Sequence, residues 1–184
     1  MEADRTSRMW VALLRGVNVG GASAVPMAKL RALARGLGWA EVQSYVASGN
    51  LVFRAAGEGV ALAAALRAAM VRGMGVDVPV MVLSGAELAA VRADCPFRPA
   101  EGRHVHGFFP WGEPALDAEL LAGLIAPKET LEVRGRVVWL HAPEGIGRSK
   151  LAGKMGRVLG GAAFTARNLN TIERLVAMTS QPGC

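Results

Sequence analysis

The sequence predicts an α+β protein made of two tandem halves, each with its elements in the order β-α-β-β-α-β. Three observations lead to this prediction. Apolar runs of strand length alternate with longer runs of helical periodicity, the same order of elements occurs twice, and the two copies account for all 184 residues without a long structureless loop. We expect a first half at 1–83, a connector at 84–102, and a second half with a closing helix at 103–184.

The first half begins with an apolar run, Met9–Leu14, that is typical of a buried strand. A helix follows, because Pro26 suits a first helical position and Gly38 a C-terminal stop. The expected elements are strand 9–15, helix 26–37, strands 41–47 and 51–54, helix 58–72 and strand 78–83. The first and last of these strands are apolar on both faces, so we expect the first sheet to be covered on both sides.

The connector contains Ser84 with Glu87 three residues later, a capping box that predicts a short helix ending near Asp94. The second half then reads strand 103–109, helix 113–124, strand 129–134, a tight turn at Gly135, strand 137–142, helix 147–159, strand 162–167 and helix 169–178. Both halves therefore match the split βαβ unit of the ferredoxin-like type, with sheet order 4-1-3-2.

Positive charge is concentrated at the two ends of the chain, which carries a net charge of +6. Residues 5–40 hold six basic side chains and 145–172 hold five, with no acidic side chain in either segment, whereas 41–144 hold nine basic and twelve acidic ones. If the ends meet in the fold, they form one basic surface that suits an acidic partner. The alternative is coding bias, since seventeen of the twenty-one basic residues are arginine.

Cysteine content and hydropathy exclude several classes of protein. Only Cys95 and Cys184 are present, which excludes a disulfide framework and a four-cysteine metal site. Residues 1–8 carry charges without an apolar core of signal-peptide length, and the apolar stretch 60–71 is interrupted by Arg67. We therefore expect a cytoplasmic protein with no export, no membrane partner and no cofactor.

A polar loop with three glycines, Arg15–Gly21, follows the first strand and precedes a helix, an arrangement in which backbone N–H groups can hold an anion. In the expected sheet order this loop and the hairpin Ser48–Asn50 lie at the same edge. Together they offer a guanidinium, two carboxamides, a hydroxyl and glycine amides, which suit a phosphate or carboxylate. The alternative is that these are turn residues only. The glycine spacing matches neither a P-loop nor a dinucleotide fingerprint.

A second polar cluster opens the closing helix. Asn168 or Asn170 can cap that helix, and its first-turn amides would face an anion beside Arg167. Capping explains only one of the two asparagines. Gly145–Lys150 forms another glycine-and-basic helix entry in the same acid-free segment. The resulting hypothesis is a phosphate-binding cleft shared by the two ends of the chain.

Three histidines are candidate metal ligands. His104 and His106 lie two apart on an expected strand, hence on one face, and His141 lies on the expected neighbouring strand. If Gly107 and its odd-numbered neighbours face the helices, the two histidines share the opposite face with Phe108, and Trp139 can join them. Zinc needs three converging ligands, so we favour ordinary sheet-surface or interface histidines and predict no metal.

Several of these motifs resemble a known family. The runs WVALLRGVNVGG at 10–21, VPM at 25–27 and YVASGNLVF at 45–53 are similar to the uncharacterised bacterial family catalogued as domain of unknown function 1697, and TARNLNTI at 165–172 resembles its closing motif. The family usually has Trp where this chain has Leu169. The resemblance implies no established activity, but it favours a site role for Arg15, Asn18, Gly20, Gly21, Ser48, Asn50, Arg167, Asn168, Asn170 and Thr171.

The leading functional hypothesis is a protein that binds an anionic or phosphorylated ligand, either a small molecule or nucleic acid, in a basic cleft. Arginines 15 and 167 would supply charge, asparagines 18, 50 and 168 would orient the ligand, and glycines 20 and 21 would allow close backbone approach. The alternatives are a small transferase or hydrolase acting on a phosphorylated substrate, and a structural or homo-oligomer-forming protein.

Overall fold

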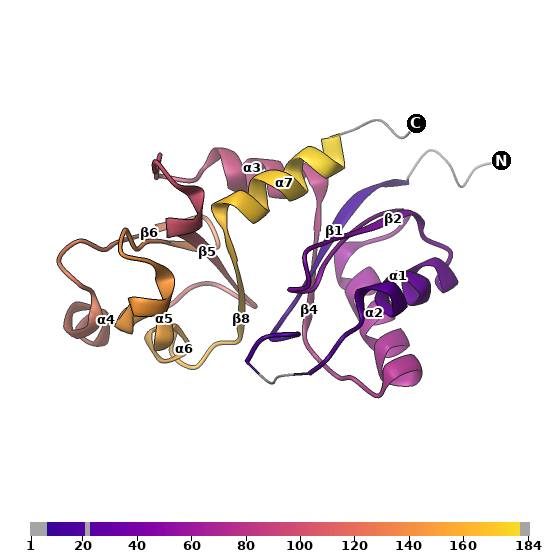
Figure 1. The fold of residues 1–184 in the computed structure, drawn as a ribbon, viewed down its shortest axis with the longest axis horizontal. Coiled ribbons are helices and arrows are strands. Elements are labelled where there is room, and N and C mark those ends of the chain that lie inside the picture. The colour runs from indigo at the N-terminus through magenta and orange to yellow at the C-terminus, as the bar shows by residue number, and fades with distance from the viewer. Residues whose placement is uncertain (1–6, 21–22, 181–184) are drawn as a thin grey trace. The chain divides into compact units, whose positions relative to one another are not determined.

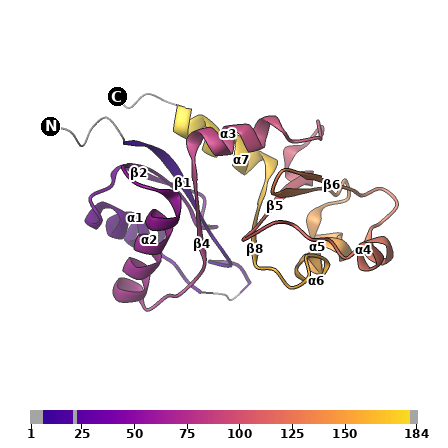
Figure 2. The same ribbon diagram turned by 180° about the vertical axis from the view of Figure 1, so that it is seen from behind.

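The computed structural model describes residues 7–20 and 23–180, and Figures 1 and 2 show it from two sides. The chain divides into two compact units. Unit 1 comprises Met1–Ala89 and Arg174–Cys184, and unit 2 comprises Ala90–Glu173. Each unit contains one four-stranded antiparallel sheet, and the described residues form seven α-helices, so the fold is mixed α+β.

Unit 1 consists of one sheet with two helices on it. Its elements are β1 (Arg8–Leu14), α1 (Met27–Gly36), β2 (Ala40–Tyr45), β3 (Asn50–Ala55), α2 (Gly59–Met74) and β4 (Val80–Ser84). The strands lie in the order β2-β3-β1-β4, and α1 and α2 lie side by side on one face (Figure 1). Read from the other edge, this is the predicted order 4-1-3-2.

Both faces of β1, a central strand of the unit 1 sheet, are buried, as its apolar pattern predicts. On one face, Trp10, Ala12 and Leu14 belong to the core beneath the helices, where the rings of Trp39 and Phe53 stack 3.9 Å apart. On the other face, Val11 and Leu13 have no exposed surface. Because both of its faces are buried, β1 is held firmly in place.

Unit 2 repeats the strand order with different helices. Its elements are η1 (Gly102–His104), β5 (Val105–Pro110), α4 (Ala118–Leu124), β6 (Thr130–Arg134), β7 (Val137–His141), η2 (Ile146–Arg148), α5 (Lys150–Gly153), α6 (Met155–Val158) and β8 (Phe164–Asn168). The strands lie in the order β6-β7-β5-β8. Phe108, Val138 and Leu140 pack against the helices in its core.

Two predicted helices of unit 2 differ from the structure. The helix expected at 113–124 begins only at Ala118, because the Asp117 carboxylate caps it by accepting a hydrogen bond from the Leu120 amide at 2.9 Å. The helix expected at 147–159 is two short helices, interrupted at Lys154, whose φ of −118° and ψ of 13° leave helical geometry.

The boundaries between the two units lie inside two helices. The expected boundaries, at residues 83 and 103, lie elsewhere. The two helices are α3 (Gly85–Ala93) and α7 (Leu169–Ser180). The predicted capping box at the start of α3 is confirmed, since the Glu87 amide donates to Ser84 Oγ and the Ser84 amide donates to Glu87 Oε2.

Within the described ranges, no helix combines the length and apolar character that a membrane crossing requires.

Substitution of Gly49, in the turn before β3, tests the packing at the end of β1. Its φ is +80°, and a Cβ there would lie 2.5 Å from Val17 Cγ2 and 2.8 Å from Leu14 Cβ. We expect Gly49→Ala to lower the free energy of unfolding by about 2 to 4 kcal/mol, because backbone strain adds to overpacking. Urea denaturation measures this loss.

Gly16→Ala is the matched control, since Gly16 also has a positive φ, +62°, but a Cβ there would meet nothing within 4 Å. Backbone strain alone costs about 1 kcal/mol. Equal losses in the two variants would contradict the close packing described at Gly49.

Candidate functional site

The loop that follows β1 is tied to two other segments of unit 1. The Leu14 amide donates to the Gly49 carbonyl at 2.9 Å, and the Arg15 amide donates to the Pro79 carbonyl at 3.0 Å. Beyond this point the Arg15 side chain is exposed, and Gly16 and Gly20 both adopt a positive φ. Gly21, the other predicted site glycine, lies outside the described residues. The loop therefore leaves the sheet at a fixed point and presents Arg15 at the surface.

Asn18 holds the loop in shape with its side chain. Its Nδ2 donates to the carbonyls of Val25 at 2.9 Å and Ala47 at 2.7 Å, and its Oδ1 accepts from the Val25 amide at 2.8 Å. One carboxamide thus joins the loop after β1, the residue preceding Pro26 and α1, and the turn after β2. The loop and the 45–50 turn are neighbours, as the predicted topology requires.

Asn50 closes the neighbouring turn and is fully buried. Its Nδ2 donates to the Tyr45 carbonyl and to Ser48 Oγ, both at 3.0 Å. These contacts and those of Asn18 match the turn interpretation of the two asparagines, since backbone groups engage both carboxamides. Among the predicted site side chains of unit 1, Arg15 is the charged one at the surface.

Two features of this region had no clear signal in the sequence. Val46 adopts a φ of +49° and is 52% exposed, an arrangement that a β-branched residue rarely takes. Val19, in the adjacent loop, is 60% exposed. Strained residues of this kind cluster at binding sites, where the surrounding structure holds them in place.

In unit 2, Arg167 is 7% exposed and lies on β8. It donates to Thr165 Oγ1 at 2.8 Å and to the Ala166 carbonyl at 2.7 Å. Burial lowers the pKa of Arg167 to about 10, so the guanidinium stays charged at neutral pH. Arg167 is thus an interior cation, in contrast to Arg15.

The residues of the closing motif have different roles in the structure. Asn168 Oδ1 accepts from the Thr171 amide at 2.9 Å, so Asn168 caps α7. Asn170 is exposed and lies against Gly102. Leu169 is 3% exposed, so the position where the family usually has Trp is an interior one in this chain.

The three histidines do not converge. His104 belongs to η1 rather than to the predicted strand. His106 is opposite Leu140 in the sheet, whereas His141 is opposite Val105, so their side chains leave opposite faces. Within residues 7–20 and 23–180, no group of three or more His, Cys, Asp or Glu side chains is arranged to hold a metal ion.

The same register shows that the opposite face of β5 from the expected one packs against the helices. Phe108 packs with Val138 and Leu140 beneath the helices. Gly107 lies on the other face, where a Cβ would meet Trp139 at 3.2 Å and Ile172 at 3.3 Å. Trp139 therefore lies on the face opposite to His106 and Phe108.

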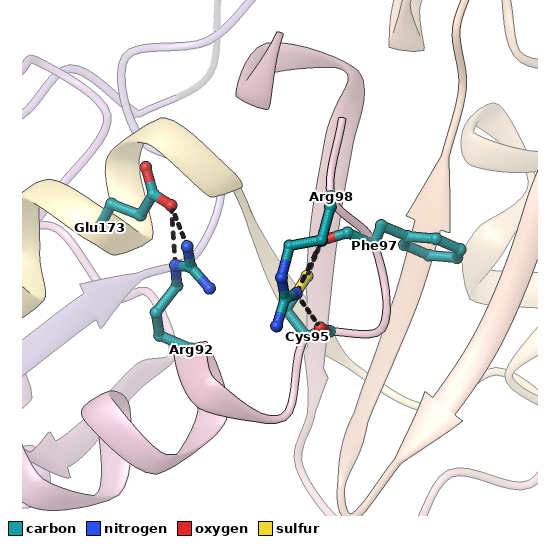
Figure 3. Close-up of polar contacts among 5 residues, drawn as sticks. All are labelled: Arg92, Cys95, Phe97, Arg98 and Glu173. Carbon is teal, nitrogen blue, oxygen red and sulfur yellow. Dashed lines mark hydrogen bonds and ion pairs between the residues drawn. The ribbon is translucent and has the colours of Figure 1, made fainter. Parts of the chain in front are cut away.

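The part of the connector drawn in Figure 3, residues 92–98, belongs to unit 2. Arg98 Nη1 donates to the carbonyls of Cys95 at 2.6 Å and Phe97 at 2.9 Å, and Arg92 Nε donates to Glu173 at 2.8 Å. Phe97 contacts the His141 ring, with centroids 5.6 Å apart. Cys95 is 2% exposed, which does not suit a reactive nucleophile.

A hollow of about 410 Å³ lies beside α4 in unit 2. Its lining residues are Asp117, Glu119, Leu120, Gly123 and Leu124. Two carboxylates at its rim oppose an anionic ligand, so this hollow does not fit the hypothesis drawn from the sequence.

The division of roles between Asn168 and Asn170 can be tested by substitution. We expect Asn168→Ala to lower the free energy of unfolding by about 1 kcal/mol, because it removes the cap of α7. Asn170→Ala is the matched control and should change stability by less than about 0.5 kcal/mol, as for other exposed positions. Thermal or urea denaturation of both variants measures the difference, and equal effects would contradict the assignment of the cap.

The environment of His106 predicts a pH dependence of stability. Its Nδ1 is buried without a hydrogen-bond partner among the described residues, and burial, followed by the charge of His104, lowers the pKa of His106 to about 4. The unfolded chain, with a histidine pKa near 6.5, then binds the proton more readily. Stability should therefore be lost as pH falls from 6.5 to 4, by roughly 2 to 3 kcal/mol from this residue.

Urea denaturation at several pH values between 7 and 4, for wild type and His106→Gln, isolates this contribution. Carboxylates titrate in both proteins, so their effect cancels in the difference. We expect the variant to lose less stability than wild type across this window. Parallel pH profiles for wild type and His106→Gln would show that His106 is not responsible.

Comparison with known proteins places the chain in a family. A sequence profile described as "Protein of unknown function (DUF1697)" matches residues 8–139, a span that ends before the closing motif. Among solved structures, the conserved bacterial protein SP0830 from Streptococcus pneumoniae has a similar fold, with a TM-score of 0.69 and 23% sequence identity over 95% of this chain and 99% of that chain. No curated protein sequence matches the chain. Since the profile spans most of the chain, this protein belongs to the DUF1697 family.

Proposed function

We propose that the chain binds an anionic, phosphorylated ligand at the loop after β1, with Arg15 as the cation that contacts it. The observation that carries the proposal is the exposed Arg15 at the start of a loop held by the three hydrogen bonds of Asn18. A guanidinium on a fixed loop loses little freedom on binding and can hold a phosphate through two parallel hydrogen bonds.

The start of α1 supports the same ligand chemistry. Asn18 bonds to Val25, which brings this loop close to the beginning of the helix. Pro26 at the cap position makes no side-chain capping bond, the first turn has no acidic residue, and Lys29 within it is exposed. The amides and positive dipole end of the helix, together with Lys29, favour negative charge.

We also infer that both sheets are of the ferredoxin-like type. The β-α-β-β-α-β order and the strand orders β2-β3-β1-β4 and β6-β7-β5-β8 support this assignment. A contribution of Arg167 and the closing motif to the same ligand, in one basic cleft, stays a prediction from the sequence.

Ligand screening of wild type and two Arg15 variants tests the proposal. The probes are inorganic phosphate, a nucleoside monophosphate, a sugar phosphate and a short single-stranded RNA, each at low and high salt. We expect at least one probe to raise Tm, because a ligand that binds the native state stabilises it. Arg15→Ala should weaken that binding by about 10- to 100-fold, the loss of a hydrogen bond to a charged group, and Arg15→Lys by less.

Arg136→Ala is the control, because it removes the same charge from an exposed arginine of unit 2. Calorimetric titration gives the dissociation constants. A steep loss of affinity with salt would identify nucleic acid, and a shallow one a small anion. The proposal is wrong if no probe shifts Tm, or if Arg15→Ala and Arg136→Ala weaken binding equally.

A further inference from the structure

The two short helices α5 and α6 carry three basic side chains along one flank. Lys150, Lys154 and Arg157 are all exposed, and each immediately precedes a residue that is buried in the unit 2 core. The buried residues keep the same spacing across the interruption at Lys154, so the three basic side chains lie on one side, about one helical turn apart. We call these three residues the basic stripe.

No carboxylate forms an ion pair with the basic stripe among the residues that the structure describes. The segment 145–172, to which the stripe belongs, contains no acidic residue. Five basic side chains elsewhere in unit 2 do pair with a glutamate, namely Arg92, Arg103, Lys128, Arg134 and Arg136. The stripe therefore differs from these cations in that its own unit does not compensate its charge.

Two carboxylates close to this segment have other partners. Glu144 pairs with Lys128 at 2.8 Å. Asp117, whose amide donates to the Val158 carbonyl at 2.8 Å, uses its carboxylate to accept from the Leu120 amide at the start of α4. Because these carboxylates are engaged elsewhere, the basic stripe keeps its positive charge.

A glycine lies among the three cations without a structural reason for its presence. Gly153 is three residues after Lys150 and four before Arg157, so it shares their side of the segment. It is the last residue of α5, but its φ is not the positive one that ends helices, and a Cβ there would meet nothing within 4 Å. Glycine destabilises a helix relative to alanine, yet here it keeps the surface between the cations low, so that the backbone of a partner can approach closely.

The composition of the segment indicates which anionic partner this surface fits. Residues 146–158 contain no aromatic side chain on which a base could stack, and no Asn or Gln that could read base edges. None of the large hydrophobic side chains exposed in the described residues lies in this segment, so it has nothing to insert into a lipid surface. A row of cations on a low surface suits a regular row of phosphates, which a nucleic acid duplex presents.

We propose that the basic stripe binds the phosphate backbone of a nucleic acid duplex without reading its sequence. Each cation neutralises a phosphate and releases counterions, so the affinity falls as salt rises. Contacts of this kind give dissociation constants on the order of 1 to 100 µM at physiological salt. The surface belongs to unit 2, and the proposal does not rest on the ligand site proposed at Arg15.

Fluorescence anisotropy of a short mixed-sequence DNA duplex, titrated with the full-length protein between about 50 and 200 mM salt, tests the proposal. The variant Lys150→Gln/Lys154→Gln/Arg157→Gln should bind at least about tenfold more weakly at the lower salt concentration, and its slope of log affinity against log salt should be smaller by about three. The charge-conserving variant Lys150→Arg/Lys154→Arg/Arg157→Lys should bind within about threefold of wild type, because phosphate contacts depend on charge. Circular dichroism checks that each variant is folded.

Lys128→Gln/Arg134→Gln/Arg136→Gln is the matched control, because it removes the same charge from three exposed residues of unit 2 that are paired with carboxylates. We expect it to keep the wild-type salt slope and to bind more tightly than the glutamine variant of the stripe. Single-stranded DNA of the same sequence, vesicles containing phosphatidylserine, and polyglutamate are the competing probes.

Four outcomes would overturn the proposal. They are no binding of the duplex by wild type at the lower salt concentration, equal losses in the stripe and control variants, tighter binding of single-stranded DNA than of the duplex, and a preference for the vesicles or polyglutamate over the duplex.

Discussion

The surface of unit 1 near Arg15 depends on one side-chain clamp, that of Asn18. Its carboxamide bonds the backbone at two points far apart in sequence, Val25 before α1 and Ala47 after β2. Without those bonds, a loop with positive φ at Gly16, Asn18 and Gly20 would have many accessible conformations. The clamp therefore converts a glycine-rich connection into a defined surface. The buried β1 strand, whose end is bonded to Gly49, supplies the fixed base.

Most of the fold could be predicted from the sequence because the signals that define it are local. Apolar runs locate the strands, and Pro26 and the Ser84–Glu87 capping box mark helix starts. The break at Lys154 and the faces of β5 could not be predicted, because both depend on packing between segments distant in sequence. Gly107 illustrates this: its lack of a side chain accommodates Trp139 and Ile172, whose positions the sequence pattern does not reveal.

The sequence predicts which segments of the candidate site lie side by side better than it predicts what each side chain bonds. Topology alone brings the loop after β1 to the turn after β2, so their adjacency follows from strand order. Whether an asparagine bonds a ligand or the backbone depends on distances between those segments, and both Asn18 and Asn50 have backbone partners. The burial of Arg167 and the positive φ of Val46 likewise arise from tertiary structure, since neither residue type favours such a place.

Comparison of the two units shows how the loop after β1 differs from its counterpart in unit 2. The equivalent connection after β5 contains Trp111 and Gly112 and no basic residue, and the turn equivalent to 45–50 is the tight one at Gly135. The two sheets have the same strand order, yet only unit 1 carries an exposed arginine on a clamped loop at this position. Loops can change in this way without cost to the sheets that support them, so two units with the same strand order can present different surfaces.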